Sequence, residues 1–392
     1  MNFKRIYPVF NKSTLLLGPR GTGKSTYVKA EVKPDLFIDL LKTSTYKILQ
    51  KNPSEVEDMV AHLKPNQVVF IDEIQKIPPL LNEVHRLIED LKLRFVLTGS
   101  SARKLKSSGV NLLAGRAINR KFFPLTLCEI GGKKKLNELI FSGTLPTAVN
   151  LSTEEEINDY LFSYVDTYLK EEVFQEGLVR NLSHFTQFIE IAGQYHAQIV
   201  NYENISRELA LSGDTIKSWF QILEDTLIGF YLEAYKLNIK PKETRHPKFY
   251  FFDPGVARAA EGNRTLDPVS EKRGFYFETL ILNELKTYIE VRQKDYKIYY
   301  YSLPGQGDVD FIIETQKKTL SKPSQFVLIN VKHGKMWNST FNKLSAEIKK
   351  KCGQRCKKMI GIYQGSLILT KDGHEIFPVL EFVEKLWQGK LF

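Results

Sequence analysis

The sequence has few cysteines and no long apolar run. Its 392 residues include three cysteines, Cys128, Cys352 and Cys356, an odd number that excludes a disulfide framework. The lone C-x3-C pair falls short of the ligand set of a structural zinc or iron–sulfur site. No apolar stretch approaches the roughly 18 residues of a membrane span, and residues 1–8 lack the apolar core of a signal peptide. We therefore expect reduced, structural cysteines, no membrane partner and a cytoplasmic location.

What the sequence does contain is a globular composition with an excess of positive charge. Hydrophobic residues make up 42% and charged residues 26%, which excludes a disordered or fibrous protein. The length suffices for about two or three domains. The 56 Lys and Arg against 45 Asp and Glu leave a formal charge of +11. Such an excess favours an anionic partner, nucleic acid or a membrane surface, and charge alone does not choose between them.

A short apolar run, residues 14–17, leads directly into a glycine-rich loop. The loop reads GPRGTGKST over 18–26, and the residues after it can continue as a helix. Its glycines let backbone N–H groups turn inward around phosphate oxygens, and the helix N-terminus adds positive potential. In this order Lys24 is expected to reach the β- and γ-phosphates and Ser25 to ligate Mg²⁺. The sequence therefore predicts an ATP site that comprises Gly18, Pro19, Arg20, Gly21, Thr22, Gly23, Lys24, Ser25 and Thr26.

Two carboxylates follow the second apolar strand. Residues 67–71 read QVVFI and end in Asp72 and Glu73. Phosphoryl transfer needs a carboxylate in the Mg²⁺ shell and a group that orients the attacking water. We expect Asp72 to serve the metal together with Ser25, and Glu73 to act as the base.

A third strand, residues 93–98, leads to Ser100, whose hydroxyl is expected to sense the γ-phosphate. An N-cap role for a helix beginning at residue 102 is compatible with that function. Arg116 ends the sequence LLAGR, and an arginine there can stabilise transferred-phosphate charge, within the chain or across a subunit boundary. Arg103 is a second candidate, and either arginine can be an ordinary surface residue. The predicted catalytic residues are Lys24, Glu73, Ser100 and Arg116.

The order of these motifs resembles the AAA-superfamily ATPases of bacteria and archaea that carry a C-terminal restriction-endonuclease-like domain of unknown function. The motifs are GPRGTGKST, VVFIDEIQKIP, LTGSSARKL, LLAGRA and FPLTLCEI, and the resemblance runs through most of the chain. It implies an αβα ATPase core with Asp72 and Glu73 as its second nucleotide motif. It also implies Ser100 as the sensor, Arg116 as an arginine finger and assembly into a homo-oligomeric ring, with a hexamer as the expected form.

The middle segment predicts a helical lid and then a helix-turn-helix. Apolar residues recur at helical spacing through 154–172, which we expect to close over the nucleotide. Two short helices, 205–210 and 215–223, flank a glycine turn, and the apolar run 226–232 can supply wing strands. The second helix can enter a DNA major groove or pack against protein, and its few basic residues leave both functions open. Its candidate DNA contacts are Thr215, Lys217 and Ser218.

The C-terminal segment resembles a nuclease with an incomplete active site. A helix over 274–285 carries Glu278, and three strands follow, the second with Asp310 and the third with Asn330 and Lys332. These residues are spaced as in the PD-(D/E)XK endonuclease fold, in which acidic residues at the first three positions hold divalent metal and Lys assists the attacking water. Asn330 replaces an acid, and a hard cation gains less from an amide oxygen. Degenerate, active and merely structural versions of this site all remain open.

A nuclease-shaped domain that has lost a metal ligand can keep its DNA-binding surface. The basic stretch 349–358, KKKCGQRCKK, suits a phosphate backbone, although a charged run is also typical of a solvated helix face. The tract 133–135, KKK, shares this ambiguity and is left without a function. Because archaeal Holliday-junction resolvases share the nuclease fold, the resemblance extends the expected partner to branched DNA and the activity to branch migration.

These expectations define an α/β protein of four parts. A P-loop AAA-type αβα core spans 1–132, a helical lid 133–180, a winged helix 181–240 and a PD-(D/E)XK nuclease-like domain 241–392. The first hypothesis is an ATP-hydrolysing DNA motor or remodeller that needs ATP and Mg²⁺. Two alternatives stay open: an ATP-regulated, Mg²⁺-dependent nuclease, and a nucleotide-switched signalling or scaffold ATPase whose winged helix binds protein.

Overall fold

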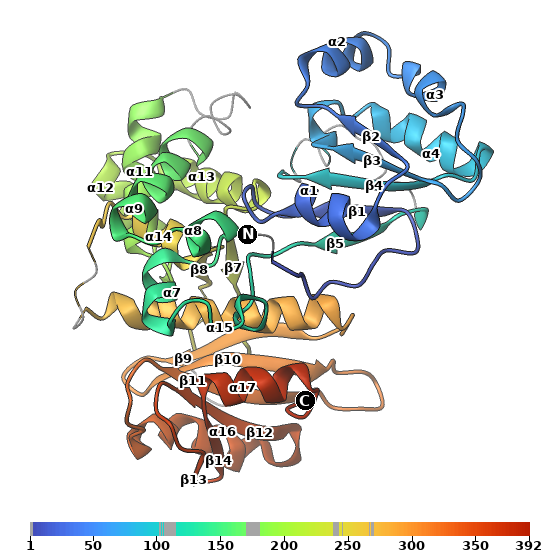
Figure 1. The fold of residues 1–392 in the computed structure, drawn as a ribbon. Coiled ribbons are helices and arrows are strands. Elements are labelled where there is room, and N and C mark those ends of the chain that lie inside the picture. Colours follow the sequence, from blue (N-terminus) through green and yellow to red (C-terminus); the bar gives the residue numbers. More distant parts are fainter. Residues whose placement is uncertain are drawn as a thin grey trace.

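The computed structural model describes residues 3–101, 103, 105, 115–169, 181–237, 243–244, 246–265, 267 and 270–392. This part of the chain is arranged around α15 (Lys272–Val291), the long helix that crosses the middle of Figure 1. The N-terminal sheet and the helical middle segment lie on one side of α15 in this view, and the C-terminal sheet lies on the other. None of the helices in the described ranges is both long and apolar enough to span a membrane.

A five-stranded parallel sheet forms the N-terminal body. Its strands are β1 (Thr14–Leu17), β2 (Leu36–Asp39), β3 (Val68–Asp72), β4 (Arg94–Gly99) and β5 (Ile118–Lys121), in the order β2-β3-β4-β1-β5. The inner strands β3 and β4 read VVFID and RFVLTG and are buried on both faces, as expected for the centre of a parallel sheet. A parallel-sheet core of this kind agrees with the αβα core that the resemblance implies.

Helices cover this sheet and connect its strands. They are α1 (Lys24–Tyr27), the π-helix η1 (Val28–Val32), α2 (Thr43–Lys51), α3 (Glu55–Val60), the 3-10 turn η2 (Ile74–Lys76) and α4 (Leu80–Asp90). Since all five strands are parallel, the carboxyl ends of β1, β3 and β4 meet at one edge of the sheet. That edge carries the glycine-rich loop, Asp72 and Ser100.

The middle segment combines helices with a small sheet. Its helices are α6 (Leu127–Ile130), α7 (Leu136–Ser142), α8 (Pro146–Asn150), α9 (Glu154–Ser163), the π-helix η4 (Tyr164–Leu169), α11 (Leu182–Gln194), α12 (Tyr202–Leu209), α13 (Gly213–Asp225) and α14 (Pro254–Ala260). The antiparallel strands β6 (Gln198–Ile199), β8 (Lys248–Phe251) and β7 (Gly229–Leu232) lie in the order β6-β8-β7. The helix expected over 154–172 changes to π geometry at Tyr164, and residues 170–172 lie outside the described ranges.

The C-terminal body is a six-stranded mixed sheet between helices. Its strands are β9 (Lys297–Leu303), β10 (Gly307–Gln316), β11 (Gln325–Lys332), β12 (Cys356–Tyr363), β13 (Leu369–Lys371) and β14 (His374–Pro378), in the order β13-β14-β12-β11-β10-β9. The 3-10 turns η5 (Ser339–Asn342) and η6 (Gly353–Arg355), α16 (Lys343–Cys352) and α17 (Val379–Trp387) complete it. The first three strands were predicted from the sequence, whereas β12, β13, β14 and α17 were not.

One apolar core unites the middle and C-terminal parts. Buried residues from Leu125 to Leu391 form a single cluster that includes Phe277, Ile281 and Leu285 of α15. The N-terminal sheet has its own clusters on its two faces. Because the segments expected to be a lid and a winged helix share this core with α15, the division of the chain into four parts stays a prediction.

A buried carboxylate joins α15 to two other helices. Glu284 is 1% exposed; its Oε2 accepts the N–H of Leu127 at 2.8 Å, and its Oε1 accepts the indole N–H of Trp387. Leu127 begins α6 and Trp387 ends α17, so one side chain ties the linker after β5 to the C-terminal helix. Burial raises the pKa of Glu284 to about 7, against the two hydrogen bonds, which lower it.

This raised pKa predicts a pH-dependent stability. The folded protein holds a proton on Glu284 that an exposed glutamate releases, so its contribution is fully present at low pH and is lost as pH rises through about 7. The stability difference between wild type and Glu284→Gln, measured by urea unfolding, should fall by up to about 1.4 kcal/mol per pH unit between pH ~5 and ~7 and then level off. Glu155→Gln, at an exposed position of α9, is the control; an equal slope there would contradict the assignment.

Candidate nucleotide site

The glycine-rich loop has the backbone shape of a phosphate-binding loop. Gly23, directly before α1, has φ 89°, a region that residues with a side chain rarely adopt. Gly18 faces the next strand so closely that a Cβ would lie 2.1 Å from the carbonyl oxygen of Phe122. Lys24 Nζ donates to the carbonyl oxygens of Gly18 at 2.7 Å and Pro19 at 2.9 Å. The ammonium group therefore lies inside the loop, where phosphate oxygens can replace these carbonyl partners.

The second motif contacts the first. Ser25 Oγ donates to Asp72 Oδ1 at 2.9 Å, and the Thr98 hydroxyl donates to the same oxygen. Asp72 ends β3 and Thr98 lies on the neighbouring strand β4, so parallel pairing fixes the carboxylate opposite the loop. A hydroxyl and a carboxylate oxygen in contact suit a hard cation such as Mg²⁺, so these two residues fit the metal that the sequence predicts.

Glu73 is held by two side chains. Its backbone has φ 59° and ψ 45°, a left-handed conformation that a residue with a Cβ adopts only under constraint. Ser100 Oγ donates to Glu73 Oε2 at 2.9 Å, and Gln75 Nε2 donates to the same oxygen. The Gln75 amide also lies 3.0 Å from Ser100 Oγ. The candidate base and the candidate sensor thus share a partner, Gln75, which the sequence did not single out.

The two candidate arginines lie in different surroundings. Arg116 pairs with Glu89 of α4 on the exposed surface of the N-terminal body. Arg103 pairs with Asp225 at 3.4 Å, which joins the segment after β4 to the end of α13. Residues 112–114, which precede Arg116 in its motif, and Ala102 lie outside the described ranges. The surface position of Arg116 suits a finger directed at a neighbouring subunit, and that role stays a prediction.

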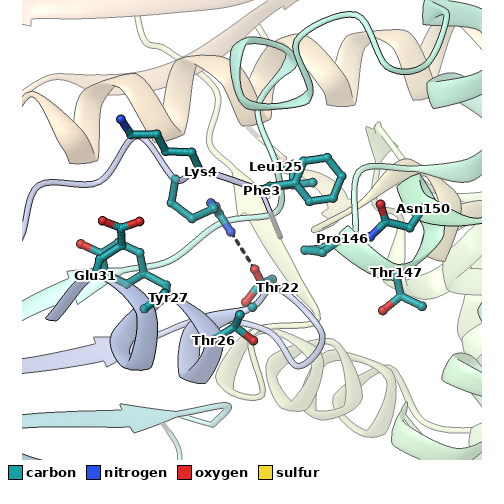
Figure 2. Close-up of a pocket in the computed structure, with 13 residues that line it drawn as sticks. Phe3, Lys4, Thr22, Thr26, Tyr27, Glu31, Leu125, Pro146, Thr147 and Asn150 are labelled. Carbon is teal, nitrogen blue, oxygen red and sulfur yellow. Dashed lines mark hydrogen bonds between the residues drawn. The ribbon is translucent and has the colours of Figure 1, made fainter. Parts of the chain in front are cut away.

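A cavity of about 430 Å³ opens beside the glycine-rich loop (Figure 2). Thr22, Thr26 and Tyr27 form one wall, and Pro146 and Asn150 of the α8 segment form the opposite wall. Thr26 follows Ser25 directly in the sequence, so the cavity continues from the phosphate-binding loop. Its position and size fit the base and ribose of a nucleotide whose phosphates occupy the loop.

The N-terminal segment, which the sequence did not connect with the site, borders this cavity through Phe3, Lys4 and Arg5. Arg5 is buried, and its Nη1 donates to the carbonyl oxygen of Thr22 at 2.7 Å. Its Nε lies 2.9 Å from Glu129 Oε1. No local sequence motif marks Arg5, because it precedes the first strand and contacts the loop through a backbone carbonyl group.

In the C-terminal body the predicted nuclease residues form a compact, charge-balanced cluster. Lys332 Nζ lies 3.1 Å from Asp310 Oδ2. Burial lowers the pKa of Lys332, but the charge and hydrogen bond of Asp310 together with the charge of Glu278 outweigh burial and raise it. Lys248 of β8, absent from the predicted set, lies 3.9 Å from Glu278 Oε1 and 3.4 Å from Asp308 Oδ2. Burial raises the pKa of Glu278 to about 7, with a further increase from the Asp310 charge that Lys248 opposes.

The Asn330 side chain forms hydrogen bonds with uncharged groups and not with these charged side chains. Its side chain is 1% exposed; Nδ2 donates to the carbonyl oxygen of Phe341 at 2.9 Å, and Oδ1 accepts from Ser345 Oγ at 2.9 Å. Within the described residues no group of three or more His, Cys, Asp or Glu side chains is placed to hold a metal ion. With Asn330 engaged and two ammonium groups beside the carboxylates, the donor set does not fit a divalent cation.

The candidate DNA-binding residues are mostly exposed. Ser212 caps α13 by accepting the N–H of Thr215, and Lys217 and Ser218 lie exposed on the same helix. The basic stretch 349–358 is not one helix face: α16 ends at Cys352, Gly353 turns the chain, and β12 begins at Cys356. Lys349 and Lys358 donate to the backbone carbonyl oxygens of Cys356 and Lys390, whereas Lys350, Lys351 and Lys357 are exposed.

Three family models match successive parts of the chain. Residues 10–131 match an AAA domain, residues 133–267 a domain of unknown function (DUF8612), and residues 273–382 a second domain of unknown function (DUF4143). The first match agrees with the loop and strand geometry described above and supports an AAA-superfamily ATPase that binds nucleotide. The other two matches carry no functional description.

Two curated relatives align with two thirds or more of this chain at low sequence identity. Uncharacterized protein Rv2008c of Mycobacterium tuberculosis is 24% identical over 310 residues, which cover 76% of this chain and 67% of that protein. An uncharacterized protein of Haemophilus influenzae is 23% identical over 283 residues, 67% of each chain.

Solved structures are similar only in part. The structure of C. elegans PCH-2 aligns with a TM-score of 0.21 and 19% identity over 44% of this chain and 41% of that one. The DNA clamp loader delta protein of Bacillus subtilis aligns with a TM-score of 0.24 and 12% identity over 55% and 84% of the two chains.

The contacts of Glu73 predict that Gln75 is a positioning residue. Gln75→Glu places a second carboxylate beside Glu73, and the repulsion between like charges should move the acid limb of the ATPase pH profile to higher pH. Gln75→Ala removes a hydrogen bond to the Glu73 carboxylate, so it should move that limb in the same direction but less far, while lowering kcat about tenfold with ATP binding within about twofold of wild type. An unchanged pH profile in Gln75→Glu would show that Gln75 does not act on the base.

Proposed function

We propose that this AAA-domain protein hydrolyses ATP with Mg²⁺ and uses the energy to move or remodel DNA. The observation that carries the proposal is the assembly at one sheet edge: Ser25 contacts Asp72, and Ser100 contacts Glu73. In this arrangement Lys24 binds the β- and γ-phosphates, Ser25 and Asp72 hold Mg²⁺, and Glu73 accepts the proton of the attacking water. Ser100 detects the γ-phosphate through its contact with Glu73.

The cavity of Figure 2 supplies a place for the nucleoside. Its walls come from the N-terminal segment, from α1 and from α8, so a bound base contacts both the sheet body and the helical segment. Residues 133–180 then act as the lid, because α8 and the hydroxyl of Tyr164, which donates to the carbonyl oxygen of Arg20 at 3.1 Å, reach the loop.

A homo-oligomeric ring, a hexamer by analogy with the AAA resemblance, completes the proposed ATPase. Arg116 is on the exposed surface and pairs with Glu89 of its own chain. In a ring it exchanges this partner for the γ-phosphate bound by the neighbouring subunit.

The proposed DNA contacts are electrostatic. The formal charge is +11, and the exposed Lys350, Lys351 and Lys357 lie on either side of the turn between α16 and β12. In this proposal α12, α13 and the three-stranded sheet act as a winged helix that adds groove or protein contacts, and the order of these elements along the chain supports it. Branched DNA and junction branch migration are the proposed substrate and activity, by analogy with the nuclease-like fold.

Cleavage of DNA by the C-terminal body is not part of the proposal. Lys248 and Lys332 neutralise Glu278 and Asp310, and Asn330 is bonded to Phe341 and Ser345. These contacts favour a domain that binds DNA without cutting it over the alternative of an ATP-regulated nuclease.

ATP turnover with linear, forked and four-way DNA tests the proposed function directly. Glu73→Gln should keep ATP affinity but lower turnover at least ~100-fold, because the base is lost while the loop is intact. Lys24→Ala should weaken ATP binding as well, and Lys29→Ala, at an exposed position of η1, is the matched control. Mixing Arg116→Ala with Glu73→Gln chains should restore part of the activity. Wild-type turnover by Glu73→Gln would remove the assigned base.

DNA binding should depend on salt through the exposed lysines. Replacing Lys350 and Lys357 together by Ala should flatten the slope of log affinity against log salt by about 0.9 per lost phosphate contact on duplex DNA. Lys47→Ala with Lys51→Ala, two exposed lysines of α2, is the control with the same change in net charge. An equal slope in both double variants would place the DNA site elsewhere, with α13 the next candidate.

A further inference from the structure

A second cavity, distinct from that of Figure 2, lies between the N-terminal sheet and the C-terminal half of α15. It measures about 550 Å³, within the ~300–1,000 Å³ typical of ligand pockets at domain interfaces. It shares no lining residue with the cavity of Figure 2, and it borders the glycine-rich loop from another side, at Gly18 and Pro19. Much of its wall is aromatic or aliphatic: Leu17, Leu105, Phe122, Phe123, Phe230 and Phe252.

Two lysines of this wall have no acidic partner. Within the described part of the chain, no carboxylate lies at ion-pair distance from Lys121 or Lys286. Lys286 Nζ instead lies 2.9 Å from the centre of the Phe230 ring and 5.3 Å from that of Phe123. Burial, with the charge of Lys121 as a further cause, lowers the pKa of Lys286 well below its ordinary value.

The acidic residues of the same wall are already engaged. Asp225 pairs with Arg103 at 3.4 Å. Glu290 lies 3.7 Å from Arg120. Glu224 accepts a hydrogen bond from the glutamine three residues earlier on α13. That glutamine is neutral, so Glu224 keeps its negative charge, and two lysines, Lys121 and Lys286, face this one carboxylate, which has no cationic partner at ion-pair distance among the described residues. The cavity therefore carries an excess of positive charge when both lysines are protonated.

We propose that this cavity binds a small aromatic acid, a ring that carries a phosphate, sulfonate or carboxylate group. Phenylalanine rings pack favourably against an aromatic ring in stacked or edge-to-face geometry, and Phe123 and Phe230 line the cavity for such a contact. The anionic group lies between Lys121 and Lys286, which supply the opposite charge. This site goes beyond the proposed ATPase, because neither lysine belongs to the nucleotide machinery.

Binding of such an acid has a second consequence. An anion beside Lys286 favours its ammonium form, so the protein takes up a proton when the ligand binds. Lys121 opposes the protonation of Lys286 and Glu224 favours it, and the other charged residues of the cavity are Arg120, Asp225 and Glu290. Affinity for the ligand therefore falls as pH rises from the pKa of Lys286 in the free protein to its higher pKa in the complex.

Pyridoxal 5′-phosphate is the probe that tests the site, because it combines an aromatic ring, a phosphate and an aldehyde. In this probe complex Lys121 holds the phosphate, and the unprotonated fraction of Lys286 condenses with the aldehyde to an imine and releases water. Borohydride then reduces the imine to a stable secondary amine. With ADP saturating the nucleotide site, mass spectrometry of peptides should find Lys286 as the main labelled residue at pH ~7. Pyridoxine 5′-phosphate, which lacks the aldehyde, should prevent the labelling by competition.

Three variants of the full chain decide the outcome. Lys286→Met should abolish the label, and Lys121→Met should lower the labelling rate at least ~5-fold because the phosphate loses a partner. Lys294→Met is the matched control, since Lys294 also lies over an aromatic ring, 5.7 Å from the centre of Tyr296, but outside the cavity. Labelling spread evenly over surface lysines, or unaffected by competitor and by Lys121→Met, would overturn the proposal. If Lys286→Met does not fold, Lys121→Met and the competition on wild type give the same decision.

Discussion

The buried guanidinium of Arg5 is the interaction on which the nucleotide site depends. Besides Glu129 and the Thr22 carbonyl oxygen, it donates through Nη2 to the carbonyl oxygen of Phe123 at 2.8 Å and stacks over the Phe122 ring, with 4.2 Å to its centre. Removing one partner of such a buried pair leaves an uncompensated charge and costs about 3–5 kcal/mol. The shape of the phosphate-binding loop is therefore fixed by a residue that precedes the first strand.

The same interaction begins a continuous connection from the loop to the C-terminal body. Glu129, the partner of Arg5, lies on α6, and Leu127 at the start of α6 donates to Glu284 of α15. Glu284 in turn accepts the indole N–H of Trp387 at the end of α17. A helix of only four residues thus connects the nucleotide loop with α15 and, through Glu284, with α17. A rearrangement of the loop at Thr22 can reach α15 through this path without a change in the apolar core.

The sequence allowed prediction of the site residues that form one continuous motif or directly follow a strand. The loop, Asp72 and Ser100 follow apolar strands, and parallel pairing alone brings strand ends to one edge, so their proximity was predictable. Arg5 and Gln75 were not, because their roles rest on contacts with a carbonyl group, a neighbouring strand end and a helix far along the chain. Lys248 was not predicted either, because its role also rests on contacts with residues that are distant in the sequence. The turn at Gly353, with φ 56°, divides a basic run that reads as one helix face.

The amide of Asn330 has a consequence for how this domain can evolve. Its nitrogen donates to a backbone carbonyl group and its oxygen accepts from a serine, so the residue is now part of the packing between β11 and α16. A carboxylate at this position would bring an acceptor against the Phe341 carbonyl oxygen and leave that group without its donor. An acidic residue at position 330 therefore needs a compensating change in the neighbouring turn as well as the substitution itself. Position 330 is thus constrained by its packing partners, so no single substitution to an acid keeps both hydrogen bonds.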